Sequence, residues 1–527
     1  MSSESTTLKP NNFLSPAATA NKEKAQTLIE QLAHPVLGHF IDGKAVPSLS
    51  GKVFTNKSPI DGSDLNETAM GDVEDVAAAS KSSSHAFESW QAWPAKKRRD
   101  LLHTIADTLE RNSESISLLE TADTGQPLRF TEKTAARGAE NFRYFADLCT
   151  RASDGHSYPT PTHLNYTVRD PIGPIAAITP WNMPFMLATW KIAPALAAGC
   201  SVIHKPAEWS PLTASLLAKL AFEAGLPSGV LNLVHGTGEQ AGTAITQDPH
   251  IRAIAFVGGT KTGSRIMSQG AASLKRVHFE LGGKSPVVVF DDADLDRAVD
   301  AVAFMIFSLN GQRCNAGSRL LIQDTIHDQF VERLIEKAKS IRVGNPFDPL
   351  TEVGPLIHQN QLAKVIQHCE EARKSGATMH CGGAVQGTTD LPSAGHWFEP
   401  AIVTGLRADM PIVQEEVFGP VLAVLPFKDE AHALALANDS RYGLSTYLWT
   451  SHIARAHRLA RAFQSGMVWV NTEISRNLST PFGGMKDSGI GRDGGDWSFD
   501  FYMETRNICI ALDAHSIPNI GKRSVKT

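Results

Sequence analysis

The sequence has few cysteines, and nothing in their spacing indicates a metal site. Its six cysteines stand at positions 149, 200, 314, 369, 381 and 509 of 527 residues. Zinc sites and disulfide-rich secreted domains both need cysteines at short, regular spacings. We therefore expect no metal site, no disulfide framework, and a reducing, cytoplasmic location in which a thiol persists.

The sequence also lacks an uninterrupted apolar run and an excess of charge of one sign. Its most apolar stretch, 172–203, is broken by four prolines and contains Asn182 and Lys191, so it predicts buried core instead of a membrane span. Fifty basic and 55 acidic side chains leave a formal charge of −5, which provides no general field for nucleic acid. The N-terminal region has no apolar signal core and no arginine before Arg98. We expect neither membrane nor nucleic-acid binding.

A chain of this length exceeds what a single hydrophobic core normally fills, so two or more domains are expected. Strand-like runs alternate with helical periodicity, which is typical of an α/β fold with parallel sheets covered by helices. The first series of strand-like runs comprises 175–179, 202–204, 230–234, 254–257 and 287–290. A second series after Asp291, with helices at 295–309 and 327–341 and strands at 421–425 and 467–470, predicts a second α/β domain.

Three side chains together suggest chemistry on a carbonyl group. Cys314 follows a helix-like run that ends at Asn310 and Gly311, which places the thiol on a turn; Glu280 ends a strand before two glycines; Asn182 lies in the apolar run. A thiol nucleophile, a carboxylate base and an amide donor are what a thiohemiacetal route requires. The alternatives are a buried apolar cysteine, a surface glutamate and a structural amide.

These segments resemble the aldehyde dehydrogenase superfamily over about residues 40–510. The segment 310–319 (NGQRCNAGSR), the segment 280–284 (ELGGK) and the glycine-rich segment 481–492 (PFGGMKDSGIGR) carry the resemblance. Within the superfamily, the segments 120–125 and 494–499 are similar to those of dehydrogenases of hydroxymuconic-type semialdehydes.

The resemblance implies a Rossmann-type cofactor domain, an α/β catalytic domain and a small β flap for oligomerisation. The expected cofactor domain is 36–152 with 171–282, and the expected catalytic domain is 283–495. The flap is expected at 153–170 with 496–515, in a homodimer or homotetramer. Residues 1–35 and 516–527 are expected to be tails, the first of them disordered because it is rich in Ser, Thr, Asn and Pro.

The resemblance also implies roles for individual residues and NAD as cofactor. Cys314 is the expected nucleophile, Glu280 the base for the hydrolytic water, Asn182 the oxyanion donor, and Lys191 completes the catalytic set. Glu208, near Lys205, would accept the ribose hydroxyls and repel a 2′-phosphate, which favours NAD over NADP. The expected cofactor contacts are Thr179, Pro180, Trp181, Lys205, Glu208, Gly238, Gly242, Phe256, Gly258, Gly259, Gly263, Leu281, Glu416 and Phe418.

The substrate is expected to be an anionic semialdehyde of aromatic catabolism, because guanidinium groups suit bidentate carboxylate binding. The expected substrate contacts are Arg137, Arg476, Trp190, Phe185, Phe482 and Arg313. The arginines have an alternative as solvated surface groups, and Ser479 stands where similar proteins tend to have a second arginine. Asp493 likewise stands where glutamate is usual. A preference for neutral aromatic or aliphatic aldehydes is the alternative.

Two other functions fit the same fold. A CoA-acylating enzyme would resolve the thioester with a thiol, and the presence of Glu280 disfavours it. A catalytically silent structural or binding protein is disfavoured by the intact set of Cys314, Glu280 and Asn182.

Overall fold

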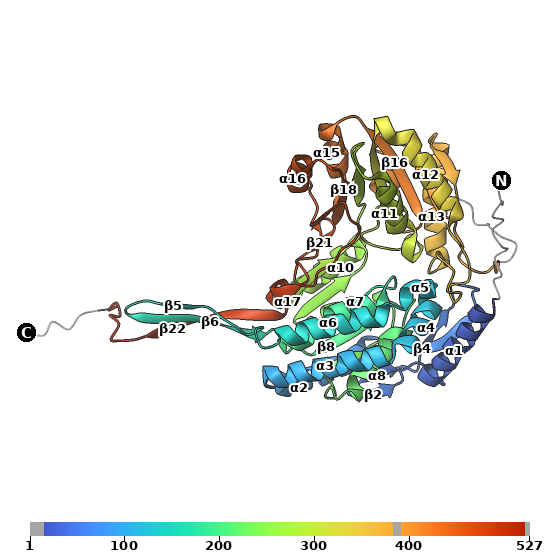
Figure 1. The fold of residues 1–527 in the computed structure, drawn as a ribbon. Helices are drawn as coiled ribbons and strands as arrows, with labels where there is room; N and C mark the ends of the chain where they lie inside the picture. The colour runs from blue at the N-terminus through green and yellow to red at the C-terminus, as the bar shows by residue number, and fades with distance from the viewer. Residues whose placement is uncertain (1–14, 383–390, 522–527) are drawn as a thin grey trace, which may run out of the picture.

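The computed structural model describes residues 15–382 and 391–521, which form two α/β domains and a projecting arm (Figure 1). The first domain contains an eight-stranded sheet in the order β2-β1-β9-β8-β7-β10-β11-β21. The strands are β1 His39–Ile41, β2 Lys44–Val46, β7 Ile175–Thr179, β8 Val202–Pro206, β9 Leu231–Leu233, β10 Ala253–Val257, β11 Arg276–Glu280 and β21 Gly489–Ile490. The five strands from β9 to β11 are parallel to one another, whereas the strands added at the two edges are antiparallel.

Helices cover this sheet, so the parallel strands β7, β8, β9 and β10 are buried along their whole length. The helices are α2 Val73–Trp90, α3 Ala95–Arg111, α4 Ser113–Thr124, α5 Leu128–Thr131, α6 Thr134–Leu148, α7 Pro184–Ala198, α8 Leu212–Glu223, α9 Thr243–Gln247 and α10 Thr260–Gly270. A hairpin of β3 Val53–Lys57 and β4 Asp64–Ala69 lies beside them. The apolar run 172–203 is therefore core, as predicted.

The second domain contains a seven-stranded sheet in the order β14-β15-β16-β13-β12-β18-β19. Its strands are β12 Pro286–Val289, β13 Arg319–Gln323, β14 Thr378–Cys381, β15 Ala401–Thr404, β16 Val421–Phe427, β18 Ser445–Trp449 and β19 Met467–Val470. Its helices are α11 Leu295–Phe307, α12 His327–Ser340, α13 Gln359–Lys374, α14 Pro411–Gln414, α15 Glu430–Asn438 and α16 Ile453–Ala462. A short pair, β17 Tyr442–Gly443 and β20 Met485–Lys486, lies outside the sheet. The predicted alternation of strands and helices is confirmed in both domains, except that the run 287–290, expected in the first series, forms β12 of the second sheet, where it pairs with β13 and β18.

The arm is a three-stranded antiparallel sheet of β5 Ser157–Pro159, β6 His163–Pro171 and β22 Met503–Ala511, and it extends away from both domains (Figure 1). The expected flap included residues from 496 onward, but α17 Gly495–Tyr502 is a helix that packs on α7. Phe499 and Tyr502 are buried there, and the Tyr502 hydroxyl donates to the Lys191 carbonyl. Burial of these aromatic rings anchors the base of the arm.

The expectation of a disordered tail over residues 1–35 is wrong for its second half. Helix α1 Pro16–Ala33 begins after Ser15, whose hydroxyl accepts from the Ala18 N–H at 3.2 Å. Its buried side chains, Ala18, Ala25, Ile29 and Ala33, form a stripe that packs on α4, α8 and β4. Small alanines carry little apolar signal in the sequence, which is why this face was missed. In the expected C-terminal tail, 516–521 are exposed and form neither helix nor strand, whereas 1–14 and 522–527 lie outside the described residues.

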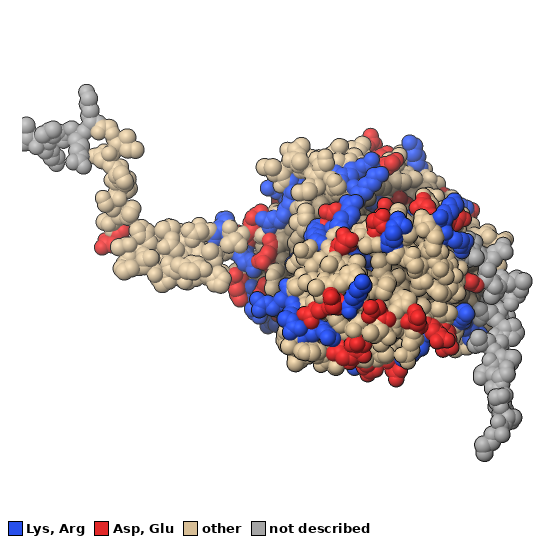
Figure 2. All heavy atoms as spheres, turned by 90° about the horizontal axis from the view of Figure 1, so that it is seen from above, with Lys and Arg blue, Asp and Glu red and all other residues tan. Residues whose placement is uncertain are grey.

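Charged side chains of both signs are interspersed over the face of the two domains shown in Figure 2. Within the described ranges, no helix has both the length and the apolar character that crossing a bilayer requires.

The packing of α1 makes a prediction about stability. Ile29 is 5% exposed, so Ile29→Ala should lower the free energy of unfolding by about 2–5 kcal/mol, through lost burial and a residual cavity. Glu30→Ala, on the exposed face of the same helix, should change it by less than about 0.5 kcal/mol. Guanidinium unfolding of the two variants measures the difference, and equal effects would show that α1 is not part of the core.

Candidate active site

The predicted nucleophile lies between the two domains, on the segment that joins α11 to β13. Cys314 is half-buried and packs against an apolar cluster that includes Trp190 and Phe482. Burial, together with the nearby carboxylates of Glu280 and Glu416, raises the pKa of the Cys314 thiol to about 12. The free protein therefore holds the thiol protonated at neutral pH, and a base is needed to activate it.

A pocket of about 170 Å³ adjoins this thiol and contains all three residues of the predicted chemistry, Cys314, Glu280 and Asn182. The other lining residues are Pro180, Trp181, Val257, Gly258, Gly259, Gly282, Gln361, Lys364, Glu416 and Phe418. Both domains thus contribute to one site.

Asn182 precedes α7 and is fixed by two hydrogen bonds. Its Nδ2 donates to the backbone carbonyl of Gln312 at 2.9 Å, and the Gln126 side chain donates to the backbone carbonyl of Asn182. Because the amide nitrogen has two N–H groups, the bond to Gln312 leaves the second for an oxygen of the substrate. Asn182 lines the same pocket as the thiol.

Glu280 ends β11, and its carboxylate is almost fully buried. Burial raises the pKa of Glu280 to about 8, against the opposing charge of Lys191. Its Oε1 is buried without a hydrogen-bond partner among the described residues. A Cβ at Gly483 would lie 2.9 Å from this oxygen, so the glycine gives the carboxylate its space. A carboxylate with a raised pKa is suited to take a proton near neutral pH.

Lys191 lies behind Glu280 and not in the pocket wall. It is fully buried, forms an ion pair with Asp493 and lies 3.1 Å from His278 Nδ1. Burial lowers the pKa of His278 to about 3, so the imidazole is neutral. Ligand atoms of His278, Glu280 and Asp493 lie within 4.8 Å of one another, but the Lys191 ammonium already provides their positive charge.

The residues opposite the catalytic groups fit a dinucleotide. Helix α10 begins after Gly259 without a side-chain cap, and no atom lies within 4 Å of a Cβ placed there, which leaves room for a diphosphate at the helix N-terminus. Glu416 accepts from the Gly283 N–H at 3.0 Å, and its carboxylate faces the pocket. Trp181 and Phe418 meet edge to face, with ring centroids 5.3 Å apart.

Lys205 is the penultimate residue of β8 and lies 3.9 Å from the Glu208 carboxylate, which is partly exposed and free to accept from a ribose. Thr179 ends β7, with its hydroxyl 2.8 Å from His204 Nε2.

The remaining predicted cofactor residues support the backbone around the site. Gly238 and Gly242 bound a π-helical turn that leads into α9. Gly263 packs against Leu281, since a Cβ there would lie 2.9 Å from the leucine side chain. Phe256 meets Phe279 edge to face with ring centroids 6.0 Å apart.

On the far side of the thiol, Arg476 stacks 3.4 Å from the Trp190 ring centroid and 4.7 Å from that of Phe482. Both terminal guanidinium nitrogens are buried without a hydrogen-bond partner among the described residues. Burial lowers the pKa of Arg476 to about 10, so the group stays charged. A cavity of about 220 Å³ adjoins it, lined also by Trp469, Asn477 and Phe482.

Arg313 lies next to the nucleophile, with its guanidinium 5.3 Å from the Phe304 ring centroid and its buried Nε without a hydrogen-bond partner among the described residues. Burial lowers the pKa of both Arg313 and Arg476, and the charge of Arg137, which is exposed on α6, acts in the same direction. Arg137 therefore lies within electrostatic range of both.

Phe185 does not join this group, which corrects the expectation that it lines a substrate tunnel. Its ring is fully buried in the first-domain core. A Cβ at Gly138 would lie 2.6 Å from it, so the ring fills the gap between α6 and α7.

Sequence reasoning missed Gln361 and Lys364, which line the pocket from α13. Lys364 Nζ donates to the Glu416 carbonyl at 2.6 Å, and Gln361 Nε2 donates to the Phe418 carbonyl at 2.8 Å. They lie on the helix face that packs toward the segment 416–418. Only their spacing on one helix face was available as a signal, and it does not distinguish them from other polar helix residues.

Comparison with known proteins gives this site a context. The sequence matches the aldehyde dehydrogenase family over residues 46–508. It is 44% identical to 5-carboxymethyl-2-hydroxymuconate semialdehyde dehydrogenase of Escherichia coli, over 88% of this chain and 98% of that protein. The solved structure of HpcC from Thermus thermophilus superposes with a TM-score of 0.93 at 45% identity, covering 95% of this chain and 98% of that chain. Betaine aldehyde dehydrogenase of Staphylococcus aureus in complex with NAD+ gives a TM-score of 0.92 at 36% identity, covering 95% and 100%.

The buried thiol makes a prediction about pH. Because the pKa of Cys314 is raised to about 12, its thiolate fraction in the free protein should rise about tenfold per pH unit between pH 7 and 9. Alkylation by iodoacetamide, assigned to Cys314 by peptide mass spectrometry, should rise in the same proportion. The exposed Cys509 on β22 monitors the reagent in the same sample. A rate at Cys314 that does not change over this range would mean that the thiolate is already formed.

Proposed function

The chain belongs to the aldehyde dehydrogenase family, whose members oxidise aldehydes with NAD, and on that basis we propose that it converts an anionic semialdehyde to the acid through a thioester on Cys314. The observation that carries the proposal is one pocket in which Cys314, Glu280 and Asn182 meet, beside a buried and unpaired guanidinium of Arg476. The first group performs the chemistry, and the second selects the substrate.

In the first step the Cys314 sulfur attacks the aldehyde carbon after Glu280, directly or through a water, takes the thiol proton. The carbonyl oxygen becomes negative and is held by the free N–H of Asn182 and by the backbone N–H of Cys314. Removing one such donor in other enzymes costs about 2.7–4 kcal/mol of transition-state stabilisation. Asn182 is suited to this role because its bond to Gln312 fixes the direction of the amide.

When bound, NAD accepts the hydride that leaves the thiohemiacetal carbon. Glu416 and Phe418 would hold the nicotinamide half, and the N-terminus of α10 after Gly259 the diphosphate. Glu208 would accept the adenosine ribose hydroxyls and repel a 2′-phosphate, which favours NAD over NADP. These positions are supported by the open space at Gly259 and the exposed part of Glu208.

In the second step Glu280, after passing the thiol proton to solvent, removes a proton from water; this water attacks the thioester and releases the acid and the Cys314 sulfur. The buried carboxylate has a pKa of about 8, which makes it a stronger base than an exposed glutamate. The pair of Lys191 and Asp493 keeps a fixed charge behind it without joining the attack. The presence of Glu280 therefore favours hydrolysis of the thioester by water over transfer of its acyl group to a thiol.

The substrate assignment follows from charge. The Escherichia coli relative named above acts on a semialdehyde of 5-carboxymethyl-2-hydroxymuconate, which is anionic. Here Arg476 presents two unpaired nitrogens beside the cavity, and Arg313 and Arg137 add positive charge. A substrate carboxylate would pair with these groups, whereas a neutral aldehyde would contact only Trp190 and Phe482.

The protein forms a homodimer or homotetramer through the arm in this proposal. Apolar side chains on or next to the arm are exposed in the single chain, among them Tyr158 at 58%, Ile510 at 47% and Leu512 at 57%. The middle of the arm shows neither basic nor acidic side chains on the face seen in Figure 2. A cytoplasmic location is supported by six cysteines that are all unpaired.

The division of labour between Cys314 and Glu280 is tested by two variants. Cys314→Ala should remove all turnover while leaving NAD affinity nearly unchanged, because the thiol is a nucleophile and not a cofactor ligand. Glu280→Gln should form the thioester more slowly than wild type, because water must then take the thiol proton, and it should stall after at most one equivalent of NADH because no base activates the hydrolytic water. Stopped-flow absorbance records both phases, and steady turnover by Glu280→Gln at the wild-type rate would contradict the assignment.

The role of Arg476 is tested by comparing substrates. Arg476→Ala should raise the Michaelis constant for a carboxylate-bearing semialdehyde about ten- to a hundredfold, because a charge-assisted hydrogen bond contributes about 1.5–3 kcal/mol. A neutral aldehyde of similar size should be affected much less. The same pair of substrates with Arg137→Ala shows whether the exposed arginine contributes. Equal losses for both substrates would assign Arg476 to packing and favour neutral aldehydes.

A further inference from the structure

The backbone just before the nucleophile has an uncommon conformation. Leu309, Asn310 and Gly311 have φ values of 54°, 57° and 69°, so three consecutive residues are left-handed. Glycine adopts this region freely and asparagine tolerates it, but for leucine it is unfavourable. Such a segment persists only where its surroundings hold it, and it then marks a place of functional constraint.

The side chain of Asn310 stabilises this left-handed segment through hydrogen bonds. It is fully buried, and its Nδ2 donates to the carbonyls of Gly125 at 3.0 Å and Pro355 at 2.9 Å. Its Oδ1 accepts from the Gly354 N–H at 2.7 Å. Both N–H groups and the oxygen of the amide are therefore used. Aspartate, which has no N–H, could not reproduce this pattern.

The same turn of the first domain also holds the oxyanion residue. Gly125 ends α4 with φ +68° and accepts from Asn310, while the next residue, Gln126, donates to the Asn182 carbonyl. Asn182 in turn donates to the carbonyl of Gln312, whose own side chain accepts from the Ile357 N–H at 3.0 Å. A closed circuit of hydrogen bonds thus joins the end of α4, the Asn182 turn, the nucleophile segment and residues 354–357.

The packing around this circuit leaves little room for adjustment. A Cβ at Gly354 would lie 2.1 Å from the Gly125 carbonyl oxygen, and one at Gly125 would lie 2.7 Å from the Pro355 ring. At Gly311 it would lie 2.2 Å from the backbone of Gly419. The amide of Asn310 therefore lies at a tight junction of the two domains, four residues before the thiol.

We propose that Asn310 is a positioning residue that sets the location of the Cys314 thiol relative to the Asn182 amide. It touches neither the thiol nor the pocket, so it acts through the left-handed turn that it holds. The role rests on the proposed function, because it concerns the acylation step. Without the amide, the turn relaxes and the thiol and the oxyanion donor no longer approach the same carbonyl group together.

The test measures the NADH burst at saturating NAD and aldehyde. Asn310→Ala and Asn310→Asp should lower the burst rate constant about ten- to a hundredfold, since small misplacements of reacting groups cost this much. Alkylation of Cys314 by iodoacetamide at fixed pH should not fall in parallel, because it needs the thiol but not the Asn182 amide. Asn310→Gly, which accepts the left-handed backbone without strain, should fold and still show the slow burst.

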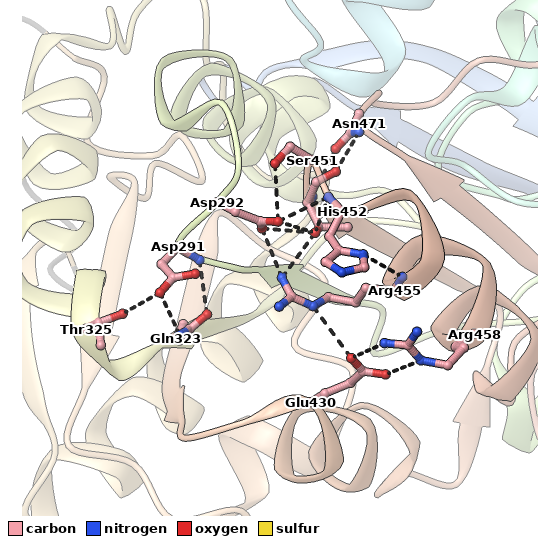
Figure 3. A network of polar contacts seen from close by, with 11 residues as sticks. Asp291, Asp292, Gln323, Thr325, Glu430, Ser451, His452, Arg455, Arg458 and Asn471 are labelled. Carbon is pink, nitrogen blue, oxygen red and sulfur yellow. Dashed lines mark hydrogen bonds and ion pairs between the residues drawn. The ribbon is translucent and has the colours of Figure 1, made fainter.

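A matched control comes from a second left-handed asparagine, Asn471, which has φ 55° and lies in the polar network shown in Figure 3. Its side chain accepts from the Thr450 N–H at 3.0 Å and donates to the Thr450 carbonyl at 2.9 Å. Asn471→Ala should lower the thermal midpoint as Asn310→Ala does, but leave the burst within about twofold of wild type.

The proposal would be overturned by a wild-type burst in the Asn310 variants, by a wild-type burst in Asn310→Gly alone, or by equal slowing in Asn471→Ala. Loss of alkylation in step with the burst would also overturn it, because the thiol itself would then be out of reach. A wild-type protein that forms no NADH with any aldehyde would overturn the proposed function and, with it, the role of Asn310. The NADH burst of the wild-type protein therefore distinguishes the two failures. If wild type shows no NADH, the proposed function fails, and if wild type shows a burst that the Asn310 variants share, only the role of Asn310 fails.

Discussion

Removal of water from the junction between the two domains determines the chemical state of the site. Burial is the largest influence on the pKa of Cys314, Glu280 and Arg476, and it disfavours the charged form of each. The thiol, with a pKa of about 12, therefore retains its proton against a carboxylate with a pKa of about 8. In the free protein the proton therefore stays on the thiol. The ion pair of Lys191 and Asp493 offsets part of the cost of burying charge so close to them.

The parallel sheet of the first domain explains how residues distant in sequence reach this junction. Lys205 lies at the carboxyl end of β8, Asn182 follows β7, Gly258 follows β10 and Glu280 ends β11, and these four strands are neighbours in the sheet. Parallel strands bring their carboxyl ends to one edge, so the turns after them form a common ligand-binding surface. The second domain then has only to deliver the thiol to this edge, and the segment between α11 and β13 does so. The catalytic arrangement is thus a consequence of topology as much as of the individual motifs.

Local sequence pattern is sufficient to predict that a residue lies on a turn or at the end of a strand. Cys314 on a turn and Glu280 at a strand end were both placed correctly, because strand periodicity and glycine positions are visible along the chain. Gln361 and Lys364 were not found, because they reach the pocket only through the packing of α13 on the segment 416–418. Phe185 was placed wrongly because an apolar run does not tell which face of a buried helix meets the core and which meets a cavity. The hydrogen-bond circuit around Asn310 likewise joins four segments that are far apart in sequence and leaves no local signal.

Substrate recognition and base strength are coupled through Arg476. Its charge acts on Glu280 and lowers the pKa of that carboxyl against the larger effect of burial. A substrate carboxylate that pairs with Arg476, as proposed, would neutralise this influence, so the pKa of Glu280 would rise when an anionic semialdehyde is bound. The carboxylate would then bind a proton more strongly, but a smaller fraction of it would be unprotonated at neutral pH. A neutral aldehyde would leave the guanidinium unpaired and the pKa of Glu280 unchanged. In this proposal, pairing of the substrate with Arg476 therefore also moves the pH range in which Glu280 acts as a base to higher values.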